Sequence, residues 1–505
     1  MGDPSPYPRR RPSAPMRRTK ILATVGPATS SLGSIRGLVR AGANALRLNC
    51  SHGSDEEHRI LLARMKEGFR RERVEGATLV DVQGPKLRIG DLAPSPLELP
   101  TGGRWVLDDS RRPGTAARAP IEIPDFARAA RRGDPILLGD GQVELRVASV
   151  GPHRIVADIV HGGRIASHAG IYLPRAHLTP SVLRPKDRHD IAVAAEIGFD
   201  FLGLSFVRDG NDIRDARREL DRRAGARETR IIAKIERAEA LAAIDDILAE
   251  ADGIMVARGD LGIEVPLERL AIEQKELLRR ARGAGKIGIV ATQMLLSMVH
   301  EPRPTRAEAT DVANAVLDGA DAVMLSEESA IGDYPQEAVR WLDRLCAAAE
   351  PSIDPTNPPT GPRLAQSTDE SIARASVALA ERIGAAAIFT PTHSGRTARL
   401  VVRSRPTTPV VALSSSAATR RHLALTWGIE AEPVPQRGNL DHLERWAREV
   451  AHRRGWTDRP LVLTAGYPVE GRPTNLVTVI DTARPPGRLP RSRLRARPRP
   501  RTADP

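Results

Sequence analysis

The chain has 505 residues, of which 41% are hydrophobic and 3% aromatic, so it can build several domains with aliphatic cores. No run approaches the roughly 18 apolar residues of a transmembrane helix, and the basic N-terminus lacks the apolar stretch of a secretory signal. Only two cysteines are present, Cys50 and Cys346. We therefore expect a reduced, cytoplasmic setting without a disulfide framework.

The net charge of +13 is concentrated at the two ends of the chain. Residues 1–18 carry five arginines against one aspartate, and residues 485–505 carry seven against one, so the tails supply +10 of the +13. Pro/Arg-rich segments of this kind cannot build a core, and we expect both to be disordered. A nucleic-acid function is disfavoured, because the sequence offers neither a folded basic groove nor an array of stacking aromatics.

The folded part of the chain begins with alternating strands and helices. Apolar runs predict strands over residues 20–25, 44–49 and 77–83, and Ser54 is a candidate N-cap for the helix after the second strand. From about residue 85 to 184 the alternation stops, and Gly/Pro turns with short alternating runs predict a small β-barrel or sandwich. Because the alternation resumes later, we interpret this segment as an inserted domain.

Five further strands follow the insertion. The apolar runs that predict them cover residues 199–206, 230–236, 253–258, 286–292 and 321–326. Short, continuous apolar runs are typical of parallel strands that are buried on both faces. With three strands before the insertion, the chain has eight βα units, which favour a TIM barrel over an open, doubly wound sheet. The expected fold class is therefore α/β, a (β/α)8 TIM barrel with an inserted β-barrel domain.

Nearly every predicted barrel strand has a polar residue near its carboxyl end, where TIM barrels build their active sites. These residues are Thr24, Arg47, Asn49, Asp81, Ser205, Lys234, Glu236, Asp260, Thr292 and Ser326. An ammonium beside two carboxylates, as in Lys234, Glu236 and Asp260, can hold a divalent metal and a phosphate. A buried structural ion pair is the alternative interpretation. Polar groups on so many strands favour a functional site.

A third domain follows a Pro-rich segment that begins near residue 355. Its alternating strands and helices predict a compact, open α/β sheet. The loop over residues 392–397, Thr-His-Ser-Gly-Arg-Thr, leads into a helix, where hydroxyls and an arginine suit a phosphate. An ordinary helix N-cap explains the same residues, and the pattern alone favours that interpretation.

The barrel motifs resemble those of the pyruvate kinase family, and they occur in that family's order. They read TKILATVGPAT, ALRLNCSHG, DVQGPKLRIG, LGLSFVR, IIAKIERAEA, ADGIMVARGDLGIEVP, VATQMLLSM, PRPTRAEATDVANAVLDGADAVMLS and GDYP. The inserted and C-terminal domains also lie where that family places them. The resemblance implies a phosphotransferase that catalyses the last step of glycolysis. It transfers the phosphoryl group of phosphoenolpyruvate to ADP with Mg²⁺ or Mn²⁺, giving pyruvate and ATP.

The resemblance also implies the domain boundaries. They are a tail over 1–18, a barrel over 19–84 and 185–353, a lid over 85–184, a regulatory α/β domain over 354–484 and a tail over 485–505. Members of the family are usually tetramers with metabolite effectors. We therefore expect a cytoplasmic homotetramer with no membrane partner.

The resemblance assigns a role to each polar residue of the site. Glu236 and Asp260 hold the metal, and Lys234 neutralises the transferring phosphoryl group and the enolate oxygen. Arg47 and Arg88 bind phosphoryl oxygens through their guanidinium groups. A relay that protonates the enolate carbon includes Thr292 and a water, because a hydroxyl alone is too weak an acid. The expected substrate-binding set is Arg47, Ser205, Lys234, Gly259, Asp260 and Thr292.

One departure from the family pattern concerns the monovalent cation. Members that depend on K⁺ have a glutamate where this chain has Lys86, and the K⁺ ligand positions correspond here to Asn49, Ser51, Asp81 and the carbonyl of Val82. A fixed ammonium can supply the charge that K⁺ otherwise brings, so we expect the enzyme to work without K⁺. The alternative is that Lys86 is a solvated loop charge.

Other departures leave the catalytic set intact. Glu327 stands in SEES where the family has Ser-Gly-Glu-Thr, Tyr172 replaces an asparagine, and a basic tail replaces the N-terminal helix. The sequence does not predict how the substitutions at Glu327 and Tyr172 affect the turnover rate. In the C-terminal loop, the resemblance implies a site for a sugar-phosphate or AMP effector. Its residues would be Thr392, Ser394, Arg396 and Thr397.

Two rival functions remain at the level of sequence. A metal-dependent lyase acting on an enolate would share the two carboxylates, but it would not need Lys234 together with Arg47 and Arg88. A regulatory paralogue would bind metabolites through the C-terminal domain and carry a disabled barrel, which the intact catalytic set disfavours.

Overall fold

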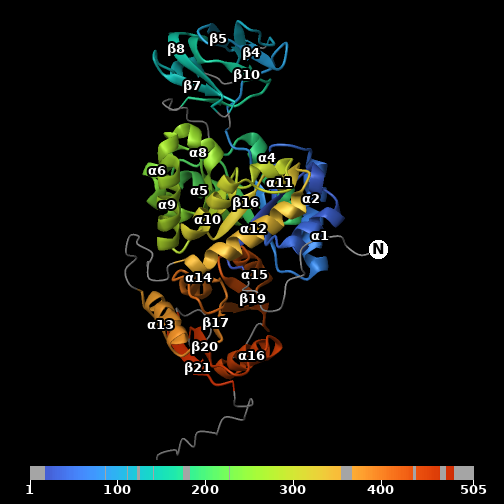
Figure 1. Cartoon of the computed structure of the whole chain (residues 1–505), viewed down its shortest axis with the longest axis vertical. Coiled ribbons are helices and arrows are strands. Elements are labelled where there is room, and N and C mark those ends of the chain that lie inside the picture. Colours follow the sequence, from blue (N-terminus) through green and yellow to red (C-terminus); the bar gives the residue numbers. More distant parts are fainter. Residues whose placement is uncertain are drawn as a thin grey trace, which may run out of the picture.

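The computed structural model describes residues 17–85, 87–110, 112–121, 126–139, 141–173, 182–226, 228–353, 367–435, 439–466 and 474–482. Figure 1 shows three units along its long axis: a strand-rich unit at one end, a helix-ringed barrel in the middle and an α/β unit at the other end. The C-terminal tail, most of the N-terminal tail and Lys86 lie outside the described residues.

The middle unit is a closed barrel of eight parallel strands, which confirms the predicted fold class. Its order is β1-β16-β15-β14-β13-β12-β3-β2. Almost every strand residue is buried, as strands with a packed barrel interior on one side and helices on the other require. The strands are β1 (Lys20–Val25), β2 (Ala45–Asn49), β3 (Ala77–Asp81), β12 (Phe201–Leu204), β13 (Arg230–Ile235), β14 (Gly253–Ala257), β15 (Ile287–Ala291) and β16 (Ala322–Leu325).

Helices surround the barrel and pack their apolar faces onto it. The predicted cap of α2 is confirmed, because the Ser54 hydroxyl accepts the Glu57 N–H and the Glu57 carboxylate accepts the Ser54 N–H. The helices are α1 (Leu32–Ala41), α2 (Asp55–Glu72), α4 (Pro185–Ile197), α5 (Gly210–Asp221), α6 (Ala238–Ala242), α7 (Ile244–Glu250), α8 (Arg258–Glu264), α9 (Leu267–Gly283), α10 (Arg306–Leu317), α11 (Glu327–Ala330) and α12 (Pro335–Ala349).

The inserted segment is strand-rich, as predicted. Its described strands form a six-stranded sheet, β11-β7-β8-β9-β5-β6, and a two-stranded sheet, β10-β4, around a core that contains the fully buried Trp105. The elements are β4 (Leu97–Leu99), β5 (Arg104–Asp108), β6 (Arg118–Pro120), the short helix α3 (Phe126–Ala129), β7 (Pro135–Leu138), β8 (Val143–Gly151), β9 (Arg154–His161), β10 (Gly163–Ile165) and β11 (Ile171–Tyr172).

The C-terminal unit is an open α/β sheet, as predicted, with apolar cores on both faces. Its order is β19-β18-β17-β20-β21, and β21 alone runs antiparallel to its neighbour. The elements are α13 (Thr368–Arg382), β17 (Ala387–Pro391), α14 (Arg396–Val402), β18 (Val410–Ser414), α15 (Ala417–Leu423), β19 (Ile429–Pro433), α16 (Leu440–Arg453), β20 (Leu461–Ala465) and β21 (Leu476–Ile480). The helix α15 was not among the predicted elements.

The end of the N-terminal tail packs against the folded units. Arg17 donates to Asp343 (2.9 Å) and Asn44 (3.0 Å), and the Arg18 N–H donates to Glu350. The Arg18 guanidinium also lies 5.3 Å from the ring centre of Trp427 in the C-terminal unit. Arg17 and Arg18, the last two residues of the expected tail, therefore find carboxylate and aromatic partners that are distant in sequence.

Candidate active site

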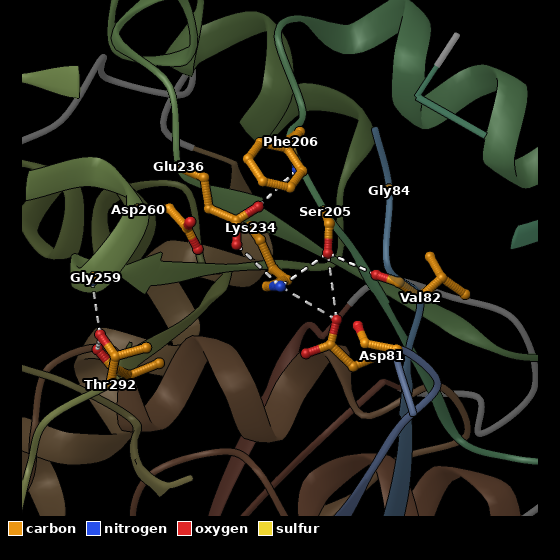
Figure 2. A network of polar contacts seen from close by, with 12 residues as sticks. Asp81, Val82, Gly84, Ser205, Phe206, Lys234, Glu236, Gly259, Asp260 and Thr292 are labelled. Carbon is orange, nitrogen blue, oxygen red and sulfur yellow. Dashed lines mark hydrogen bonds and ion pairs between the residues drawn. The ribbon is translucent and has the colours of Figure 1, made fainter. Parts of the chain in front are cut away.

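The predicted polar residues converge at the carboxyl end of the barrel. Figure 2 shows Asp81 from β3, Ser205 after β12, Lys234 from β13 and Glu236 just after it, with Asp260 and Thr292 beside them. Parallel strands bring their carboxyl ends to one rim of the barrel, so residues far apart in sequence meet there.

The Lys234 ammonium lies at the centre of this group. It donates to the Ser205 hydroxyl (2.8 Å) and pairs with Glu236 (3.0 Å) and Asp81 (3.3 Å). Burial by itself lowers the pKa of Lys234, but the carboxylates of Asp81 and Glu236 outweigh burial and raise it. The lysine is therefore a permanent cation, and 13% of its side chain is exposed.

Glu236 is buried and faces Asp260. Its carboxylate accepts the Phe206 N–H at 2.7 Å, and Phe206 adopts a positive φ of 57°, which is uncommon for a residue with a side chain. Burial raises the pKa of Glu236, and the negative charge of Asp260 raises it further, against the opposing effect of Lys234. Figure 2 shows the two carboxylates pointing toward one another. Two acids held together in this way favour a cation between them.

The donor set fits a hard divalent cation. Among the described residues, no group of three or more His, Cys, Asp or Glu side chains could hold a metal by itself. Mg²⁺ commonly binds through one or two carboxylates and completes its shell with water and substrate oxygens. Glu236 and Asp260 supply those two carboxylates, and Asp260 lies in the first turn of α8.

Arg47 and Asp81 form a buried ion pair beside Lys234. The Arg47 Nε donates to Asp81 at 2.7 Å, and its Nη1 donates to the Thr24 hydroxyl at 3.0 Å. Burial favours the neutral form of Asp81, but the charges of Lys234 and Arg47 outweigh it and lower the pKa of that carboxyl. One carboxylate thus holds two cations, the Arg47 guanidinium and the Lys234 ammonium, next to one another.

Arg88 lies apart from this cluster, on the stem of the inserted domain. We use this name for the two paired backbone segments at residues 87–89 and 169–172. Its Nη1 donates to the carbonyl of His168 at 2.8 Å, and Arg88 pairs with Gly170 in an isolated β-bridge. The predicted phosphoryl-binding pair Arg47 and Arg88 therefore comes from two different units of the molecule.

The expected monovalent-cation positions take part in hydrogen bonds of the site. The Asn49 side chain accepts the Ser51 N–H at 3.1 Å, and the Val82 carbonyl accepts the Ser205 hydroxyl at 2.7 Å. Gly84 follows with φ of +65°, and a Cβ there would lie 2.9 Å from the Ser205 Cβ, so only glycine fits this close approach. Lys86 lies outside the described residues, and its role stays a prediction.

Thr292 is held in a strained backbone conformation. Its φ is +69°, an outlier for a β-branched residue, and Gln293 follows at +55°. The hydroxyl donates to the Ala291 carbonyl (2.6 Å) and accepts the Gly259 N–H (2.8 Å). The expected substrate residue Gly259 thus directs its N–H at Thr292. Such strain persists only where the surroundings impose it, and it is frequent at active sites.

Sequence reasoning missed three residues that support this site. Arg258 donates to the carbonyl of Thr292 at 2.7 Å and to Asp311 at 2.6 Å, and so braces the strained segment. Phe206 supplies its N–H to Glu236. Tyr172, noted in the sequence as a substitution, donates its hydroxyl to Asp260 at 2.7 Å. The available signals were the position of Arg258, two residues before Asp260, and the substitution at Tyr172.

Glu327 lies at the start of α11 and is exposed. Its neighbour Glu328 points inward, where it accepts the N–H groups of Leu295 (3.0 Å) and Ser326 (2.7 Å). The additional charge of Glu327 therefore lies at the surface.

The C-terminal loop forms internal contacts. The Thr392 hydroxyl accepts the Gly395 N–H (2.9 Å) within the turn that precedes α14, and Thr397 is buried against Thr474 (2.7 Å). Arg396 pairs with Asp369 at 2.8 Å, and the Ser394 carbonyl accepts from Arg230 in the barrel at 3.2 Å. The effector assignment of this loop stays a prediction.

Comparisons with known proteins agree on one family. Residues 16–339 match the family model "Pyruvate kinase, barrel domain", and residues 370–480 match "Pyruvate kinase, alpha/beta domain". A pyruvate kinase of Agrobacterium vitis is 40% identical over 90% of this chain and 95% of its own length. A pyruvate kinase of Geobacillus stearothermophilus is 39% identical over 92% of this chain and 80% of its own length. The crystal structure of a pyruvate kinase from Cryptosporidium parvum superposes with a TM-score of 0.86 at 32% identity, covering 92% of this chain and 96% of that one.

Proposed function

The chain belongs to the pyruvate kinase family, and from its site we propose that it transfers the phosphoryl group of phosphoenolpyruvate to ADP with Mg²⁺ or Mn²⁺. The observation that carries this proposal is the Lys234 ammonium fixed between Asp81, Glu236 and Ser205, next to the facing carboxylates of Glu236 and Asp260. Phosphoryl transfer needs positioning and charge neutralisation more than covalent help.

Each residue of the site has a task in this reaction. Lys234 neutralises negative charge on the phosphoryl group during its transfer and on the oxygen of the enolate that is formed. The guanidinium groups of Arg47 and Arg88 bind phosphoryl oxygens from the barrel and from the lid. A cation bound by Glu236 and Asp260 supplies further positive charge to the substrate oxygens.

Protonation of the enolate carbon then completes the reaction. We assign Thr292 to the relay that delivers this proton through water, because its hydroxyl is fixed at the site by Gly259 and Ala291. The inserted domain acts as a lid that excludes bulk water from the enolate and the phosphoryl group.

The direct test follows ATP, pyruvate and phosphoenolpyruvate together. We expect ATP and pyruvate to form in equal amounts, only when ADP and a divalent cation are both present, and to stop on chelation. A lyase would consume phosphoenolpyruvate without ADP. A regulatory paralogue would bind it without turnover. Either result would contradict the proposal.

We further propose that the enzyme works without K⁺, since Lys86 can supply a fixed positive charge. Activity in buffer free of Na⁺ and K⁺ is expected to change little when KCl replaces an equal ionic strength of tetramethylammonium chloride. A many-fold rise with KCl would show that the lysine does not replace the ion.

Regulation and assembly complete the proposal. We propose a cytoplasmic homotetramer whose activation by a sugar phosphate or AMP uses Thr392, Ser394, Arg396 and Thr397. The variant R396A is expected to lose activation and to keep basal turnover, because Arg396 is 67% exposed and belongs to the C-terminal unit, not to the barrel. An unchanged activation curve would count against this site, and light scattering would test the tetramer. Within the described part of the chain, no helix is both long and apolar enough to cross a membrane.

A further inference from the structure

The stem of the inserted domain reaches one of the two facing carboxylates. Tyr172 ends β11, which pairs with β7 in the six-stranded sheet, so this residue belongs to the inserted domain. Its side chain nevertheless lies buried against the barrel, with 6% of the residue exposed. The hydroxyl donates a hydrogen bond to Oδ1 of Asp260 at 2.7 Å, across 88 residues of sequence.

This hydrogen bond occupies one oxygen of the Asp260 carboxylate. A hydroxyl that donates to a carboxylate at this distance forms a strong, charge-assisted bond, and it fixes the rotation of the group about its last side-chain torsion. A tyrosine holds such an orientation at little entropic cost, because two side-chain torsions define it.

The backbone around Tyr172 is held firmly. The Ile171 N–H donates to the carbonyl of Leu87 at 3.0 Å, and Gly170 forms a bridge with Arg88. The two segments of the stem thus carry Arg88 and Tyr172 on neighbouring stretches of backbone, and Tyr172 reaches Asp260. The geometry of Asp260 is therefore coupled to the position of the stem.

We propose that Tyr172 is a positioning residue for the divalent-cation site, which holds the Asp260 carboxylate in the orientation that binds the cation. This inference rests on the proposed role of Glu236 and Asp260. The sequence departure at this position, tyrosine in place of asparagine, then supplies a hydroxyl that supports the metal ligand directly. Outer partners of metal ligands contribute in this way to affinity, typically by about 10- to 100-fold.

The test measures Mn²⁺ binding by electron paramagnetic resonance in the absence of substrates, with the full-length protein. Y172F removes the hydroxyl and keeps the ring, and it is expected to raise the Kd for Mn²⁺ about tenfold while the thermal midpoint stays near that of the wild type. Y172M, which keeps a long apolar side chain without a ring or hydroxyl, is expected to weaken Mn²⁺ binding to a similar extent. The matched control is Y334F, which removes a hydroxyl from a tyrosine at the surface.

The outcomes separate this inference from the proposed function. If E236Q and D260N lose Mn²⁺ binding but Y172F and Y172M bind it as tightly as the wild type, Tyr172 does not position the ligand and the inference is overturned. If E236Q and D260N also bind Mn²⁺ normally, the proposed cation site itself is wrong. In the kinetic assay, Y172F is expected to raise the Mg²⁺ concentration needed for half-maximal activity more than it lowers kcat.

Discussion

At the scale of single residues, the site depends on one buried carboxylate that serves two cations. Asp81 pairs with Arg47 at 2.7 Å and with Lys234 at 3.3 Å, and it is 1% exposed. An isolated charge in such a place would be unstable, but the two cations lower the pKa of this carboxyl and keep it ionised. The acid therefore fixes both positive groups before any substrate arrives.

The variant D81N is expected to destabilise the fold by about 3 kcal/mol, because it leaves two buried cations without their shared counter-charge. Urea unfolding followed by fluorescence measures this loss. The control D215N breaks the exposed ion pair with Arg218 and should cost below about 1 kcal/mol. Equal unfolding midpoints for the two variants would show that Asp81 contributes no special stability.

At the scale of elements, the loop before α10 is held by one acidic residue at the start of the helix. The Thr305 hydroxyl accepts the Glu308 N–H (3.2 Å), and the Glu308 carboxylate accepts the Thr305 N–H (2.7 Å), a reciprocal capping pair. Glu308 also accepts the Ser297 N–H at 2.7 Å. The helix start is thereby tied to the segment that follows Thr292.

We expect T305A to lower stability by about 1 kcal/mol, since it removes the N-cap acceptor of α10. The control lies in the same helix: the exposed Thr310 hydroxyl bonds back to the Arg306 carbonyl at 2.9 Å, and T310A should be neutral or slightly stabilising. Thermal unfolding of both variants compares them directly. A loss at T310A as large as that at T305A would contradict the capping account.

The barrel strands could be predicted to within about two residues because each is a buried apolar run with polar ends. For example, the run predicted over residues 230–236 is β13, Arg230–Ile235. The supporting contacts could not be predicted. The Phe206 N–H reaches Glu236 across 30 residues and the Tyr172 hydroxyl reaches Asp260 across 88, and no local pattern specifies either partner. The positive φ of Thr292 is likewise imposed by its surroundings.

At the scale of the whole molecule, the barrel and the C-terminal unit are joined by buried charges and one tryptophan. Arg405 pairs with Asp321 at 3.1 Å and lies 4.6 Å from the ring centre of Trp427, which Arg18 also contacts. Lys20 of β1 donates to the Ile429 carbonyl at 2.8 Å. Burial of this lysine, with help from the nearby charge of Arg17, lowers its pKa to about 8.

This pKa predicts how the stability of the joined units depends on pH. The pKa of Lys20 is lower in the folded than in the unfolded chain, so the cost of burying its charge is present in full below about pH 8. That cost disappears as the pH rises toward the unfolded value of 10.5. The free energy of unfolding of the wild type, relative to that of K20M, should therefore rise by about 1–2 kcal/mol between pH 7.5 and 9.5. One pKa unit corresponds to about 1.4 kcal/mol.

Denaturant midpoints of K20M and the wild type at several pH values test this prediction. The control K275M changes an exposed lysine, and its difference from the wild type should be flat over the same range. A difference between K20M and the wild type that does not change with pH would contradict the account of the buried lysine.

The central claim is that the Lys234 ammonium stabilises the phosphoryl group as it passes from phosphoenolpyruvate to ADP. The most direct measurement is the rate of ATP formation by K234M at saturating Mg²⁺ and substrates, beside the matched control K275M. We predict a loss of at least about 10³-fold in kcat for K234M, with Mn²⁺ binding retained and K275M unaffected. ATP formation by K234M at a rate near that of the wild type would contradict the account.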